Sequence, residues 1–139
     1  YTMFIGSGAL WGETILFSMC ILEEMQWKRT RYITSADFFH GTLELVEPGV
    51  PVFLFMGEDE NRKLDERVRA FLTRGVTGDT DINIIDTAEF AIPGLDDEFR
   101  VIVSPWILSS LVTDRLAAYY ETVTKHNLNY RRYYHQFDY

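Results

Sequence analysis

The feature that most constrains the fold is a continuous apolar run at residues 50–57, with the sequence Val-Pro-Val-Phe-Leu-Phe-Met-Gly. A short run without polar interruptions is typical of a strand that a parallel sheet buries on both faces. Parallel strands need long crossover connections, which are usually helices. This segment therefore favours an α/β protein over other fold classes.

The rest of the chain alternates between strand and helix patterns, as an open parallel sheet with right-handed crossovers requires. Strands are predicted at residues 1–5, 31–35 and 81–86, and helices at residues 13–27, around 64–72 and at 106–126. Ser35 is a candidate cap for a brief helix holding residues 37–40. Residues 100–103 fit an edge strand or the lead into the last helix, where Pro105 suits the first turn. We expect a three-layer α/β/α fold.

Composition limits the size of the protein and its partners. With 139 residues, of which 47% are hydrophobic, the chain suits one domain with one packed core, at residues 1–139. A net charge of −8 repels a phosphate backbone, so we expect no nucleic-acid partner. A lone cysteine, Cys20, permits no internal disulfide and favours the cytoplasm.

Apolar run length predicts no membrane-spanning helix and no membrane partner. The longest nearly unbroken run, residues 15–22, is far shorter than the roughly 20 residues that cross a bilayer. The chain opens within a predicted strand, so we expect it to be part of a longer protein.

Two segments present a carboxylate and an imidazole that together suit proton transfer. Glu24 lies at the end of the apolar helix, and His40 follows two phenylalanines in the next element. If both meet one substrate, they can move protons between neighbouring atoms, which is the chemistry of a sugar isomerase. Each also has an ordinary interpretation: Glu24 as an exposed helix-end acid and His40 as a capping or core histidine.

Other polar groups are candidates for substrate binding. The turn at Gly6, Ser7 and Gly8 follows the first strand and can aim backbone N–H groups at a phosphate, although an ordinary strand-to-helix turn fits equally well. Arg131 and Arg132, in the aromatic tail at residues 127–139, can bind a substrate carboxylate or phosphate, or pair with acids at a subunit contact. The remaining histidines have no partners at metal-ligand spacing, so we expect no metal and no cofactor.

Several motifs together resemble the second sugar-isomerase (SIS) domain of the fructosamine 6-phosphate deglycases, relatives of the isomerase half of glucosamine-fructose-6-phosphate synthase. They extend over nearly the whole chain, and they are the Gly-Ser-Gly turn, Leu-Glu-Glu-Met-Gln-Trp at residues 22–27, Asp-Phe-Phe-His-Gly at 37–41, Glu-Leu-Val-Glu-Pro-Gly-Val-Pro at 44–51, Leu-Asp-Glu-Arg at 64–67, and Arg-Arg-Tyr-Tyr at 131–134 before a terminal Asp-Tyr.

The resemblance implies a fold, an activity and roles for residues. It implies that Glu24 is the acid/base group, that His40 opens the sugar ring in the site of a neighbouring subunit, and that the substrate is a phosphorylated sugar-amine. It also implies a homodimer or higher homo-oligomer, whose phosphate is held mostly by a preceding SIS domain.

Two departures from the family pattern bear on the substrate. The family usually has Gly-Glu before the aromatic-His-Gly motif and proline after it, whereas this chain has Ala36-Asp37 and Thr42. The tail lacks the lysine that closes the synthase site, which is consistent with a deglycase. A phosphosugar-sensing module without catalysis and an aldose-ketose isomerase are the alternatives.

Overall fold

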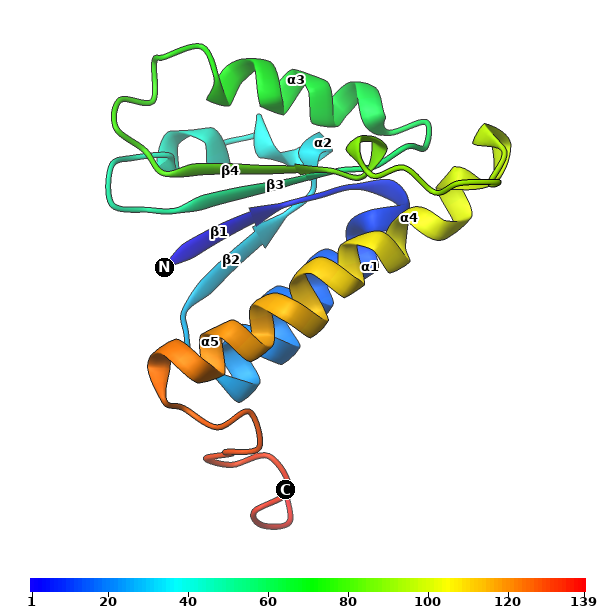
Figure 1. The fold of residues 1–139 in the computed structure, drawn as a ribbon. Coiled ribbons are helices and arrows are strands. Elements are labelled where there is room, and N and C mark those ends of the chain that lie inside the picture. Colours follow the sequence, from blue (N-terminus) through cyan, green and yellow to red (C-terminus); the bar gives the residue numbers. More distant parts are fainter.

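The computed structural model describes residues 1–139 as a parallel sheet with helices on both faces (Figure 1). The sheet is four-stranded, in the order β2-β1-β3-β4, and every neighbouring pair is parallel. The strands are β1 (Thr2–Ile5), β2 (Thr30–Ile33), β3 (Val52–Met56) and β4 (Ile82–Asp86). The predicted α/β fold with a parallel sheet is therefore confirmed, and β3 is the almost wholly buried strand that its apolar run indicated.

Two long helical stretches cover one face of the sheet, where Figure 1 draws them side by side. The first stretch comprises η1 (Gly8–Leu10), α1 (Trp11–Ile15) and the π-helical η2 (Leu16–Met25). The second comprises η5 (Asp97–Phe99), α4 (Arg100–Leu108), the π-helical η6 (Ser109–Leu116) and α5 (Ala117–Thr124). Their shared core with the sheet includes Phe4, Phe17, Leu22, Phe55 and Val112.

Shorter helices cover the other face of the sheet. They are α2 (Ser35–Phe38) and α3 (Arg62–Leu72). The short η3 (Thr42–Leu45) leads from α2 to β3, and η4 (Thr87–Glu89) follows β4. Alternation along the strands divides the apolar side chains, so that Phe4 lies in one core and Met3 and Ile5 lie in the other. One sheet thus separates two helical layers, and the candidate site residues are divided between these layers.

The capping residue of α2 is Thr34 and not Ser35. The hydroxyl of Thr34 accepts the N–H of Asp37 at 3.1 Å. Ser35 is buried instead, and its hydroxyl donates to Oδ1 of Asp65 at 2.6 Å. The prediction for Ser35 was wrong because a contact with α3 turns its side chain into the core.

Residues 100–103 are helical, and Pro105 lies inside α4 and not in its first turn. Proline has no N–H to donate to the carbonyl four residues earlier. Here that carbonyl, on Val101, accepts the hydroxyl of Ser104 at 3.1 Å. The helix therefore continues past a residue that usually interrupts one.

One helix, Asp97–Thr124, is long and apolar enough to cross a membrane by length and composition alone. It has 28 residues, and its most apolar window has a mean hydropathy of 1.3 with 22% of that window buried. The prediction from run length missed this stretch because polar residues interrupt it. Leu108, Val112 and Ala117 on this helix lie in the core, and core helices of globular proteins meet the same criteria.

Candidate active site

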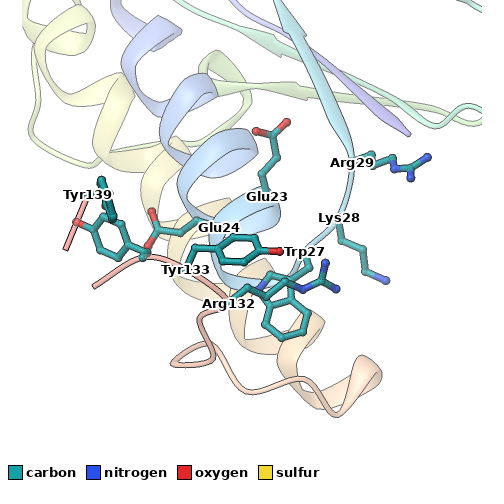
Figure 2. A pocket seen from close by; sticks show the side chains of 9 residues that line it. Glu23, Glu24, Trp27, Lys28, Arg29, Arg132, Tyr133 and Tyr139 are labelled. Carbon is teal, nitrogen blue, oxygen red and sulfur yellow. The ribbon is translucent and has the colours of Figure 1, made fainter. Parts of the chain in front are cut away.

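Glu24 lies in the last turn of η2, at the amino-terminal end of the parallel strands. Its neighbour Glu23 points toward β2, where it accepts the hydroxyl of Thr30 at 2.6 Å. Glu24 points to the other side of the helix, toward the C-terminal tail (Figure 2). The two adjacent acids therefore have different partners.

Arg131 of the tail forms an ion pair with Glu24. Its Nε lies 2.9 Å from Oε1 of Glu24, and the two side chains are only 17% and 30% exposed. Sequence reasoning assigned Arg131 to substrate or to a subunit contact, whereas within this chain it pairs with the candidate catalytic acid. Arg132, also a candidate for substrate binding, has no acidic partner and lies with its guanidinium 4.1 Å from the ring centre of Trp27.

A cavity of about 500 Å³ opens beside Glu24, between the end of η2 and the tail (Figure 2). It combines acids, bases and aromatic rings, which is a mixture suited to a polar ligand with an apolar or aromatic part. The lining residues are Glu23, Glu24, Trp27, Lys28, Arg29, Arg132, Tyr133, Tyr134 and Tyr139. The tail therefore folds over Glu24.

Gln26 and Trp27 explain why the tail lies here. The buried amide of Gln26 donates to the carbonyl of His126 at 2.7 Å and accepts the hydroxyl of Thr124 at 2.9 Å. Trp27 adopts a left-handed φ of 53°, and its ring packs against His126 with centroids 4.3 Å apart. Sequence reasoning gave these residues no role, although their place directly after Glu24 in the family motif was a signal.

His40 lies in a different layer of the molecule. It follows α2, whose Phe38 belongs to the core on the face opposite η2. Its side chain is 80% exposed, with Nδ1 3.8 Å from Oδ1 of Asp37. Phe39 packs against Phe71, so the preceding aromatic residues anchor the segment while the imidazole faces outward. Within one chain the structure does not bring His40 and Glu24 together.

The turn at Gly6, Ser7 and Gly8 follows β1, at the carboxyl end of the strands, which is the end of the sheet opposite to Glu24. The Ser7 hydroxyl accepts the N–H of Ser35 at 2.8 Å. The N–H of Ala9 donates to the carboxylate of Asp59, which also crowds the position that a Cβ on Gly8 would take. An internal carboxylate therefore binds at this turn, where the sequence suggested a phosphate.

The two carboxylates with altered pKa values, Asp65 and Asp86, lie at this same carboxyl end of the strands and not beside Glu24. Burial raises the pKa of Asp65, although hydrogen bonds from Ser35 and Gly57 oppose the change. Hydrogen bonding to Arg62 lowers the pKa of Asp86, whose two oxygens lie 2.9 and 2.7 Å from the guanidinium. These contacts join α3 to the ends of β3 and β4. No group of three His, Cys, Asp or Glu side chains has the arrangement of a metal site.

Solved structures with this fold define the class of the protein. The chain superposes with a TM-score of 0.87 and 30% identity on a putative phosphosugar isomerase from Bacillus subtilis. It superposes with a TM-score of 0.86 and 31% identity on one from Salmonella typhimurium. Each match covers 99% of this chain and 41% of the other. The chain is an SIS domain.

Sequence relatives specify the family further. Fructosamine deglycase FrlB of Bacillus subtilis is 32% identical over 136 residues, which cover 96% of this chain and 39% of that protein. Fructoselysine 6-phosphate deglycase of Escherichia coli is 36% identical over 116 residues, covering 81% and 31%. The agropine synthesis conjugase of Rhizobium rhizogenes is 27% identical over 139 residues, covering 98% and 39%.

This SIS domain is thus a homologue of the fructosamine deglycases, and it spans less than half the length of these relatives. No protein-family model matches the chain.

Proposed function

We propose that this chain is the C-terminal SIS domain of a fructosamine 6-phosphate deglycase, which converts a fructosamine 6-phosphate and water into glucose 6-phosphate and an amine. The names of two relatives support this reaction, and their alignments cover 96% and 81% of the chain. The observation that carries the proposal is the cavity beside Glu24, where a carboxylate with an arginine partner borders a space of about 500 Å³.

Glu24 carries the proton transfer in this proposal. With the sugar in its open form, its carboxylate removes a proton from C1, beside the amine nitrogen, and the resulting enaminol takes up a proton at C2. The product is an imine at C1, which water hydrolyses to the aldehyde of glucose 6-phosphate and the free amine. A positioned general base contributes on the order of 10²–10⁴ in rate.

His40 opens the sugar ring, since an imidazole can donate to the ring oxygen or accept the anomeric proton near neutral pH. Its exposure and its position on the other face of the sheet support a role in the site of a second copy. We therefore propose a homodimer or higher homo-oligomer with shared sites. We also propose that the full protein acts in the cytoplasm.

The phosphate binds mostly to a preceding SIS domain in this proposal. The carboxylate of Asp59 at the turn of Gly6, Ser7 and Gly8 supports that assignment, because it accepts the N–H of Ala9 that an anion bound there would need. Arg132 remains a candidate to bind the phosphate or a carboxylate of the substrate, since it lines the cavity without an acidic partner.

The substitution Glu24→Gln in the full-length protein tests the reaction. It keeps the size of the side chain and removes the base, so release of glucose 6-phosphate should fall by about 10²–10⁴-fold. Glu98→Gln is the matched control, because Glu98 is exposed in η5 and does not line the cavity, and its activity should stay near that of the parent protein. Full activity in Glu24→Gln would contradict the proposal.

Aldose-ketose isomerisation is a second candidate, favoured by the names of the two solved structures, which are putative phosphosugar isomerases. Interconversion of hexose 6-phosphates without an amine would support it. Binding of a fructosamine 6-phosphate with no product from either reaction would support a sensing module.

A further inference from the structure

Arg131 is held by contacts within the chain, unlike an arginine whose guanidinium is free to bind a ligand. Its Nε lies 2.9 Å from Oε1 of Glu24 in an ion pair, and its NH1 group donates to the carbonyls of Leu128 and Tyr130 at 2.7 and 2.8 Å. Two backbone carbonyls and one carboxylate of the protein itself therefore hold the guanidinium. We propose that Arg131 is a positioning residue for Glu24 and does not bind the substrate, an inference that rests on the proposed function.

The contact with Arg131 orients the carboxylate of Glu24. It engages Oε1 and leaves Oε2 with no hydrogen-bond partner in the protein, so one oxygen is fixed and the other is available for a proton. A free glutamate side chain samples several rotamers, and a base must lie within hydrogen-bond reach of the proton that it removes. An arginine held by the tail supplies that restraint.

The tail holds Arg131 independently of Glu24. Gln26 attaches the end of η2 to the carbonyl of His126, and the ring of Trp27 lies between His126 and the guanidinium of Arg132. These contacts fix the segment on both sides of residue 131. The pair of Arg131 and Glu24 is therefore part of a packed unit, unlike a surface ion pair between two mobile side chains.

No other basic residue replaces Arg131 at this carboxylate. Lys28 and Arg29 line the same cavity, but neither forms an ion pair with Glu24 (Figure 2). Arg131 is also the better buried of the two tail arginines, since Arg132 is exposed. The two adjacent arginines thus have separate roles, in which Arg131 orients the acid and Arg132 faces the cavity.

Steady-state kinetics of the full-length protein with a fructosamine 6-phosphate test this role. In Arg131→Gln, kcat should fall by about 10²-fold, the size of effect caused by misplacing a catalytic group, while KM changes by less than about threefold. Arg131→Lys keeps the charge but cannot contact both carbonyls and the carboxylate, so its kcat should be intermediate. Arg74→Gln, at an exposed arginine in a loop after α3, is the matched control.

A double substitution separates positioning from substrate binding. If Arg131 acts through Glu24, adding Arg131→Gln to Glu24→Gln should lower kcat by less than about twofold, because interacting residues are not additive. The inference would be overturned if the double variant lost kcat by the product of the two single effects, or if Arg131→Gln raised KM with unchanged kcat. Either result would leave the proposed function standing. If Arg131→Gln does not fold, Arg131→Lys alone decides: parent kcat in that variant would also overturn it. An active Glu24→Gln would instead refute the proposed function.

Discussion

Gln26→Ala should destabilise the protein by about 2–3 kcal/mol. The substitution removes the bond from Nε2 to the carbonyl of His126, which contributes about 1 kcal/mol, and leaves that partly buried carbonyl without its partner at a further cost of about 1–2 kcal/mol. Thr124 loses little, since its hydroxyl also donates to the carbonyl of Tyr120 at 2.6 Å. For a chain of 139 residues this corresponds to a fall in melting temperature of about 6–12 °C.

Thermal melting followed by circular dichroism measures this effect. The control is Gln136→Ala, which removes the other glutamine of the chain, whose side chain makes one exposed hydrogen bond to the carbonyl of Tyr134. Its melting temperature should change by less than about 2 °C. Equal melting temperatures for Gln26→Ala and Gln136→Ala would refute the interpretation that Gln26 fastens the tail to η2.

Three further substitutions test contacts elsewhere in the fold. Because the pKa of Asp86 is lowered in the folded state, its ionic stabilisation is complete above the unfolded pKa of about 3.9 and is lost as pH falls through the folded value. Urea unfolding should therefore find Asp86→Asn less stable than the parent at pH 7, with the difference shrinking below about pH 4; a constant difference would contradict the assignment. Ser104→Ala should cost about 1 kcal/mol in urea unfolding, because the carbonyl of Val101 loses its donor next to Pro105, and an unchanged midpoint would show that this bond is dispensable. Asp59→Ala should cost about 1–2 kcal/mol by the same measurement, as a lost cap does, and a neutral result would show that its contact with Ala9 contributes nothing.

Local sequence signals predicted the sheet well and two helix details poorly. The apolar run of β3 and the β-branched residues of β4 identify each segment as a strand from only a few neighbouring residues. The observed strands lie inside the predicted ranges or within one residue of them. Thr34 and Ser35 are both residue types that cap helices well. Only the contact of Ser35 with Asp65 determines which of them caps α2. Pro105 fits a first turn by its type, whereas the hydroxyl of Ser104 allows it in the helix interior.

The candidate site was predictable only in part. The motif around Glu24 identified the residue, but its partner Arg131 lies at the far end of the chain, where no spacing rule relates the two. The Gly-Ser-Gly turn gave a reasonable phosphate prediction, which took no account of Asp59, because that carboxylate arrives from the loop after β3. The separation of His40 from Glu24 follows from the crossover of the chain to the other face of the sheet, which a motif does not reveal.

Mixing two inactive variants of the full-length protein tests the shared site most directly. Glu24→Gln and His40→Ala should each be inactive, but one of the two sites in a mixed dimer would contain both intact residues. Random exchange of subunits in an equal mixture should therefore restore about a quarter of the parent activity. No recovery, with exchange verified by tagged subunits, would contradict the claim that Glu24 of one copy and His40 of another act on the same sugar.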